Sequence, residues 1–130
     1  MKTIAKSATA IVLVHFVINI LHGNAHDNLK IGLTAMQLLF VWIVILILPF
    51  VGAGMLWTRF WRAGALLLAI AMAGSLLFGI WNHFVVSGPD HVAHVAAGSS
   101  GTLFQTTAVL LAISEAAGTW IAFRGLRRMS

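Results

Sequence analysis

The sequence predicts an all-α integral membrane protein, a single bundle of four transmembrane helices with both chain ends on the cytoplasmic side. Three observations predict this class. Apolar residues make up 60% of the 130 residues and charged residues only 8%, whereas soluble domains carry about 25% charged residues. Four apolar segments reach the ~20 residues that cross a bilayer as a helix. The basic residues gather at one end of these segments.

The four apolar segments predict helices over about residues 4–25, 33–57, 63–86 and 102–124. Together they form one domain, residues 1–130. Pro49 lies inside the second segment, and we expect it to kink that helix because proline lacks a backbone N–H. A short outer helix is expected over about residues 90–96, where Asp90 follows Pro89 and can cap a first turn.

Charge sets the predicted orientation. Seven of the eight basic residues fall at one end of the bundle, namely Lys2, Lys6, Arg59, Arg62, Arg124, Arg127 and Arg128. The connections at the other end hold only Lys30. The positive-inside rule therefore places both termini in the cytoplasm of a bacterial inner-membrane protein, with the other connections in the periplasm or outside the cell. The net charge of +5 is then a topology signal, and we expect the lipid bilayer, and no nucleic acid, as partner.

The sequence lacks the residues that several classes of site require. The chain has no cysteine, which excludes a disulfide framework and a thiolate metal site. It contains no nucleotide-binding loop, no catalytic serine signature and no HExxH sequence. Chemistry would have to come from the six histidines and three acidic residues.

Five of the histidines fall at the predicted outer ends of the helices or just beyond them: His22, His26, His83, His91 and His94. The first two are an i, i+4 pair on one face of the first helix, a spacing that can place two imidazoles on one metal ion. Imidazole suits copper and zinc alike. The sequence therefore predicts an outward-facing site for a transition metal, Cu or Zn, with Asp27 and Asp90 orienting the ring N–H groups.

A second polar group is expected inside the membrane. His15 and Asn19 lie on or near the same strip of the first helix as the histidine pair, a strip about 40° wide. Glu115 lies inside the fourth helix, and an acid in a membrane segment is a functional hypothesis by default. Glu115 precedes Arg124 by the same number of residues by which His15 follows Lys6, so we expect an interhelical pair. It would be a structural contact or one step of a proton path.

Two alternatives to a metal site remain open at this stage. The first is a b-type haem that carries electrons, with its iron between His83 and His22 or His26; Met72 opposite His15 would be a speculative second site. The second is an accessory subunit of a larger membrane complex, or a homo-oligomer, whose histidines line an interface.

Overall fold

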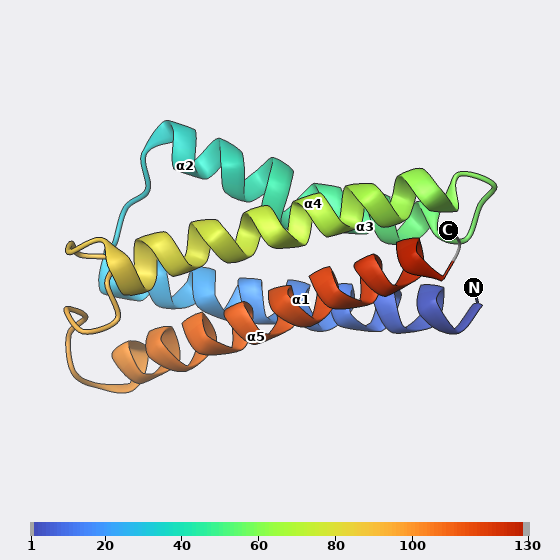
Figure 1. Cartoon of the computed structure of the whole chain (residues 1–130). Helices are drawn as coiled ribbons and strands as arrows, with labels where there is room; N and C mark the ends of the chain where they lie inside the picture. Colours follow the sequence, from blue (N-terminus) through green and yellow to red (C-terminus); the bar gives the residue numbers. More distant parts are fainter. Residues whose placement is uncertain (1, 129–130) are drawn as a thin grey trace.

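A computed structural model describes residues 2–128, and within them every regular element is a helix. The elements in chain order are α1 (Lys2–Leu29), α2 (Ala35–Phe40), η1 (Val41–Ile47), α3 (Leu48–Met55), α4 (Trp61–Ile80), η2 (Trp81–Val85) and α5 (Ser99–Arg127). They form four continuous helical spans, each long and apolar enough to cross a membrane. The two chain ends lie at the same end of the bundle, which we call the terminal end (Figure 1).

The short helix expected over residues 90–96 is replaced by turns, which corrects that prediction. The backbone there forms turns of its own, with the N–H of His94 donating to His91 O at 2.9 Å, and it also bonds to neighbouring segments. The N–H of Val92 donates to the carbonyl of His83 at 2.9 Å, and the carbonyl of Val92 accepts from Gln105 Nε2 at 2.8 Å. These contacts hold the loop across the opposite end of the bundle, which we call the histidine end.

The helical turns that directly precede Pro49 are π-helical. In η1 the backbone bonds reach five residues back, and the N–H of Leu48 continues this pattern by donating to Ile43 O. Pro49 is the second residue of α3, which continues this helical span without a break.

Close packing of α3 against α4 near the terminal end depends on a glycine. A Cβ added to Gly64 would lie 2.6 Å from Met55 Cβ and 2.8 Å from Gly52 O, so only a glycine permits this approach of α3 to α4. The buried core cluster around this contact is wholly apolar, and it consists of Ala5, Ala8, Val12, Ala53, Leu56, Ala65, Leu68, Met72 and Ala122.

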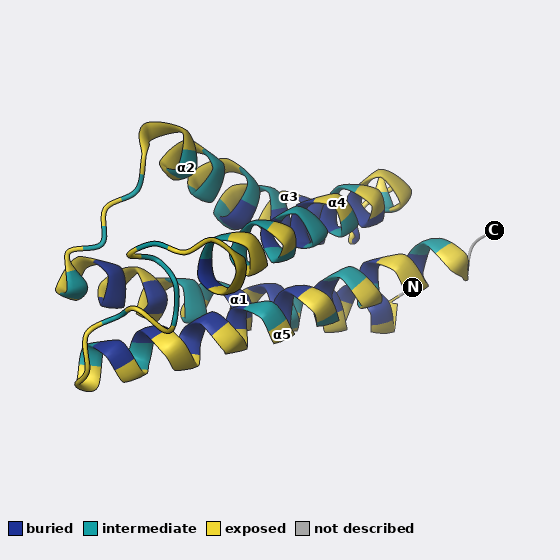
Figure 2. Ribbon diagram, turned by 60° about the vertical axis from the view of Figure 1, so that its left-hand side comes forward, coloured by how far each residue is buried: buried dark blue, intermediate teal, exposed yellow. Residues whose placement is uncertain are grey.

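Figure 2 shows the buried positions on the inward sides of the helices and the exposed ones on the outside. Large apolar side chains make up much of that exposed surface. Met36 is 75% exposed, Leu77 69% and Ile70 61%. Water would be an unfavourable environment for so continuous an apolar surface.

Candidate metal centre

Three buried histidines meet at the histidine end of the bundle. One ring nitrogen from each of His22, His26 and His83 lies within 4.8 Å of those of the other two. The rings of His22 and His83 are centred 4.8 Å apart, and those of His22 and His26 4.9 Å. The triad is therefore close enough to hold a metal ion, which confirms the predicted grouping of these three residues.

The end of α1 positions His26 and the chain that follows it. Lys30 adopts a left-handed conformation, with φ of 58°. Its N–H donates to Asp27 O at 3.2 Å, and the N–H of Ile31 donates to His26 O at 3.0 Å. These two bonds form a Schellman motif, which closes the helix. The reversal returns the carbonyl of Ile31 to the His26 ring, 3.2 Å from Nδ1.

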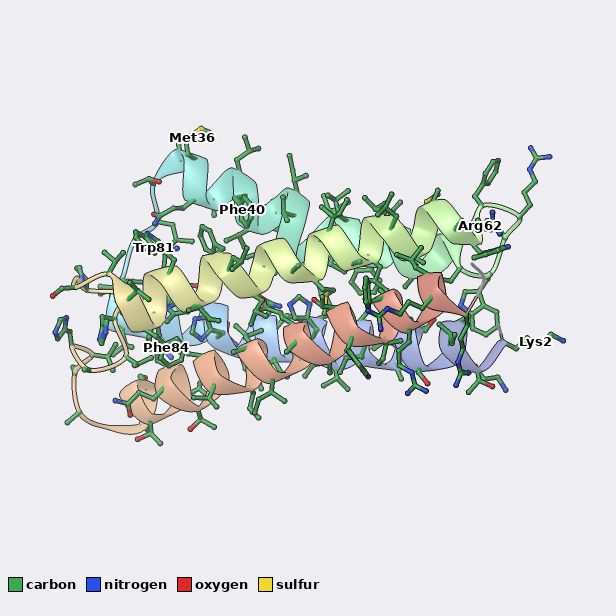
Figure 3. The ribbon with its side chains drawn as sticks, in the orientation of Figure 1. Lys2, Met36, Phe40, Arg62, Trp81 and Phe84 are labelled. Atoms are coloured by element: carbon green, nitrogen blue, oxygen red, sulfur yellow. The ribbon has the colours of Figure 1, made fainter. Side chains whose placement is uncertain are left out.

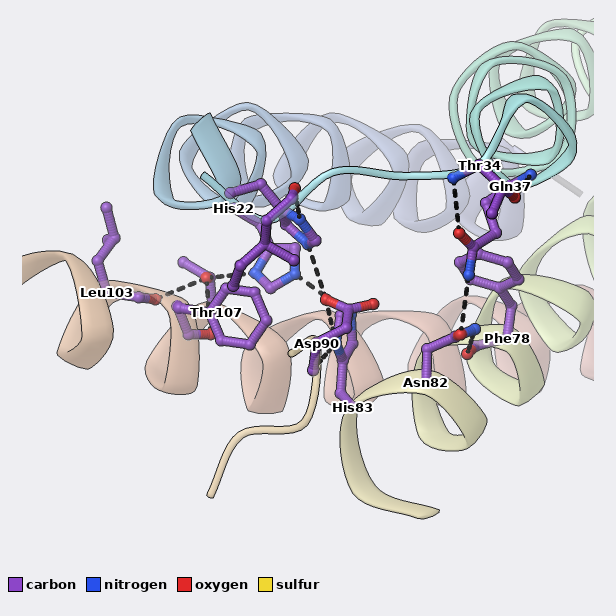
Figure 4. Close-up of polar contacts among 12 residues, drawn as sticks. His22, Thr34, Gln37, Phe78, Asn82, His83, Asp90, Leu103 and Thr107 are labelled. Carbon is purple, nitrogen blue, oxygen red and sulfur yellow. Dashed lines mark hydrogen bonds and ion pairs between the residues drawn. The ribbon is translucent and has the colours of Figure 1, made fainter. Parts of the chain in front are cut away.

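His83 is carried by the π-helical turn η2. The N–H of Val86 donates to Trp81 O, five residues back, at 2.9 Å. Such π-turns occur inside α-helices at functional sites. The loop that follows folds back, so that Asp90 O lies 3.0 Å from His83 Nδ1. The Nε2 of this ring lies beside His22 Nε2 and its Nδ1 beside Asp90 O (Figure 4).

The hydrogen-bond partners fix where the neutral rings of His22 and His83 carry their protons. His22 Nδ1 lies 2.8 Å from Thr107 Oγ1, and that hydroxyl uses its one proton to donate to Leu103 O at 2.6 Å. The hydroxyl oxygen can therefore only accept from His22 Nδ1–H. His83 Nδ1 faces the carbonyl of Asp90 and must also donate. Both neutral rings thus point unprotonated Nε2 atoms at each other, 3.2 Å apart.

Asp90 brings a carboxylate to the same place. His26 Nδ1 faces Ile31 O and so carries the proton of the neutral ring, which leaves Nε2 facing Asp90 Oδ1 at 3.2 Å. Oδ1 also lies 3.4 Å from His83 Nδ1. Despite this proximity the buried Oδ1 makes no hydrogen bond of good geometry with the residues described. An unsatisfied buried oxygen is costly, and a bound cation would offset that cost.

Two residues of α5 complete the site, and our sequence analysis missed both. Phe104 is fully buried, with its ring centred 4.7 Å from that of His22 and 5.0 Å from that of His26. Thr107 holds His22 Nδ1, as described above. The signal that could have found them is helical spacing, since positions 104 and 107 lie three and two turns before Glu115 on the same face.

Three residues of the predicted site lie apart from the triad: Asp27, His91 and His94. His91 Nε2 lies 3.2 Å from Phe84 O, and His94 Nδ1 lies 3.0 Å from Gly88 O. These two histidines therefore bond the turns of the loop, and their rings pair with each other at 4.8 Å between centres. Asp27 is exposed at the end of α1. Of the two aspartates, Asp90 lies beside the histidines.

The polar group inside the bundle is assembled from α1 and α5. His15 Nε2 lies 3.2 Å from Glu115 Oε1, and both residues are buried. Asn19 Nδ2 donates to His15 O at 2.9 Å and lies 3.0 Å from His15 Nε2. The carboxyl group of Glu115 thus turns toward another helix and away from the outer surface of the bundle.

One cavity of about 90 Å³ connects the two polar groups. His22, His26, His83 and Asp90 line one part of it, and Asn19 and Glu115 another. Apolar side chains form much of the wall between them, among them Val41, Ile45, Phe78 and Leu111. By the criterion that about 10–15 Å³ of such space holds one water, there is room for several water molecules.

The arrangement gives no support to a haem held between His22 and His83. Two axial nitrogens on opposite faces of an iron would lie about 4 Å apart for bonds near 2 Å, but the Nε2 atoms of His22 and His83 are 3.2 Å apart. The cavity of about 90 Å³ is also far below the ~300–1,000 Å³ of typical ligand sites. Met72 lies in the apolar core, and His15 is engaged with Glu115.

No protein-family model matches this chain, and no curated protein or solved structure is significantly similar to it.

Proposed function

We propose that this protein binds a transition-metal ion, copper or zinc, through His22, His26 and His83. The observation that carries the proposal is the contact between two Nε2 atoms, in His22 and His83, at 3.2 Å. Both atoms are unprotonated in the neutral rings, so the contact is repulsive unless a cation or a shared proton lies between them. Asp90 Oδ1, which lies within 3.4 Å of nitrogens of His26 and His83 without a hydrogen bond, adds negative charge beside the same cluster.

The spacing also suits a tetrahedral ion. Metal–nitrogen bonds of about 2.0–2.1 Å set ligand nitrogens about 3.3 Å apart around zinc, close to the 3.2 Å between His22 and His83. Each Nδ1–H of the triad is held by an oxygen, which is how proteins orient ligating imidazoles. Three nitrogen ligands leave a fourth position for water or a substrate, as catalytic zinc sites do.

The site belongs, in this proposal, to a multi-pass membrane protein with both termini in the cytoplasm. The continuous apolar surface supports insertion, because hydrocarbon would cover side chains such as Leu77 and Ile70 that are otherwise exposed. Figure 3 places Lys2 and Arg62 at the terminal end and Trp81 and Phe84 toward the histidine end. By the positive-inside rule the histidines then face the periplasm or the cell exterior.

Metal titration tests the proposal. Chelator-treated protein in detergent should bind one Zn²⁺ or Cu²⁺ per chain, measured by calorimetry and by elemental analysis after dialysis. His83→Ala should abolish this binding. His94→Ala is the matched control, because His94 is exposed and bonds a loop carbonyl, and it should bind like the wild type. Equal binding by the two variants would refute the site.

A further inference from the structure

The contact with His15 involves only one of the two carboxylate oxygens of Glu115. The residue is only 3% exposed, and its Oε1 contacts His15 Nε2 at 3.2 Å. Oε2 lies beside the space next to Gly79, and Glu115 lines the cavity that it shares with the histidines. A buried carboxylate oxygen needs a partner. Water in the cavity would supply one.

Gly79 of α4 keeps the space between Glu115 and His83 open. A Cβ placed on this glycine would lie 3.7 Å from Glu115 Oε2 and 3.9 Å from His83 Cδ2. The two functional groups therefore approach the same side-chain-free spot from α5 and η2. Other polar groups line the same cavity, including Asn19 on α1 and Ser75 on α4. Ser75 Oγ donates to Ala71 O and keeps lone pairs that can accept from water.

The series of buried polar groups that begins at the histidines ends at His15 and Glu115. Toward the terminal end the next buried residues are those of the apolar core, such as Val12, Leu68 and Met72, each at most 1% exposed. A dry, close-packed core of this kind carries no chain of water molecules. The polar cavity is therefore closed at one end.

We propose that this cavity is a one-ended water path along which Glu115 exchanges protons with the histidine site. A proton given up by water at the histidines is taken by Glu115 Oε2, which converts the carboxylate to the carboxylic acid, while Oε1 stays on His15. The groups that face this carboxyl are His15 from α1 and His83 from η2. The water path rests on the cavity alone, and its role beside a metal rests on the function proposed above.

Infrared spectroscopy of the metal-free protein tests the path. At acidic pH the C=O band of protonated Glu115 is the one that Glu115→Gln removes. In D₂O it should exchange rapidly in the wild type and in Gly79→Ala, whose methyl group would make only ordinary contacts. Gly79→Leu fills the gap, so exchange should be about tenfold slower or more, because it must wait for the helices to open. Ala112→Leu, which fills the same cavity from α5, is the second blocking variant.

The outcomes separate the two proposals. A wild-type band that stays unexchanged for hours, or folded blocking variants that exchange as fast as Gly79→Ala, would overturn the water path. Zn²⁺ titration of the same proteins should show wild-type affinity for Glu115→Gln and Gly79→Ala. If Zn²⁺ fails to bind while exchange is fast, the metal proposal falls and the path stands. Liposomes with the protein should hold a pH gradient as well as empty ones; a leak removed by Glu115→Gln would contradict the closed end.

Discussion

The Nε2 atoms of His22 and His83 lie 3.2 Å apart although 61 positions separate the two residues in the chain. Each ring is turned to this contact by an oxygen on its other nitrogen, Thr107 Oγ1 for His22 and Asp90 O for His83. Neither neutral ring can move its proton from Nδ1 to Nε2 without losing the hydrogen bond at Nδ1, so two unprotonated Nε2 atoms face each other. This arrangement is prepared for a cation, and it leads to the predictions below.

Removing the Thr107 hydroxyl should weaken metal binding. Thr107→Val keeps the shape of the side chain but releases His22 Nδ1, so the ring loses the bond that fixes its orientation. Loss of such a partner costs about 10–100-fold in metal affinity, and Zn²⁺ calorimetry would measure it. Thr107→Ser restores the hydroxyl and should recover most of the affinity. If Val and Ser behave alike, Thr107 does not orient the ligand.

Substitution of the two aspartates, Asp90 and Asp27, should affect metal affinity differently. Asp90→Asn removes the negative charge that lies 3.2 Å from His26 Nε2, and we expect a loss of about 10–100-fold in Zn²⁺ affinity. Asp27→Asn changes an exposed carboxylate at the end of α1 and should leave the affinity unchanged. The pair of variants carries the same change of charge, so long-range electrostatics alone would lower both affinities equally, and that result would contradict a local role for Asp90.

Metal affinity should fall as the pH drops. Ligating imidazoles must be neutral, and their ordinary pKa is about 6.5, so protons compete with the metal below that value. We expect Zn²⁺ binding to be strongest above about pH 7 and to weaken below about pH 6, because protons compete with the metal for the imidazole nitrogens. Titrations at several pH values would measure this. An affinity that stays constant down to pH ~5 would argue against imidazole ligands.

Cysteine labelling tests the orientation. The chain has no natural cysteine, so a single introduced thiol reports its own side of the membrane. Ser99→Cys, exposed at the histidine end, should react with an impermeant maleimide added to intact cells. Thr58→Cys, exposed in the connection at the terminal end, should react only after the membrane is opened. The reverse pattern would place the histidines in the cytoplasm.

The sequence predicted the helices well because hydrocarbon length and charge placement are properties of single segments. The four spans follow directly from the apolar runs. Turns were harder: residues 90–96 have the composition of a capped helix, but contacts of His83 O and Gln105 with Val92 determine their shape. Such contacts depend on the packed bundle and leave no local pattern.

Site residues on helices could likewise be predicted from the sequence, whereas those on loops could not. His22, His26 and His83 lie on helices, so their depth and face could be worked out from spacing. His91 and His94 lie on a loop, where spacing says nothing about direction, and their rings bond nearby carbonyls. Thr107 drew no notice because a threonine in a helix commonly bonds its own backbone. Only the position of α5 beside α1 gives its hydroxyl a second partner.

X-ray absorption spectroscopy of the zinc-loaded protein tests the central claim most directly. We predict one zinc per chain with three imidazole nitrogens in its first coordination shell at about 2.0–2.1 Å, and a His22→Ala, His83→Ala double variant that retains no zinc after dialysis. A protein that takes up no zinc or copper, or a double variant that binds zinc with the same spectrum, would contradict the metal site.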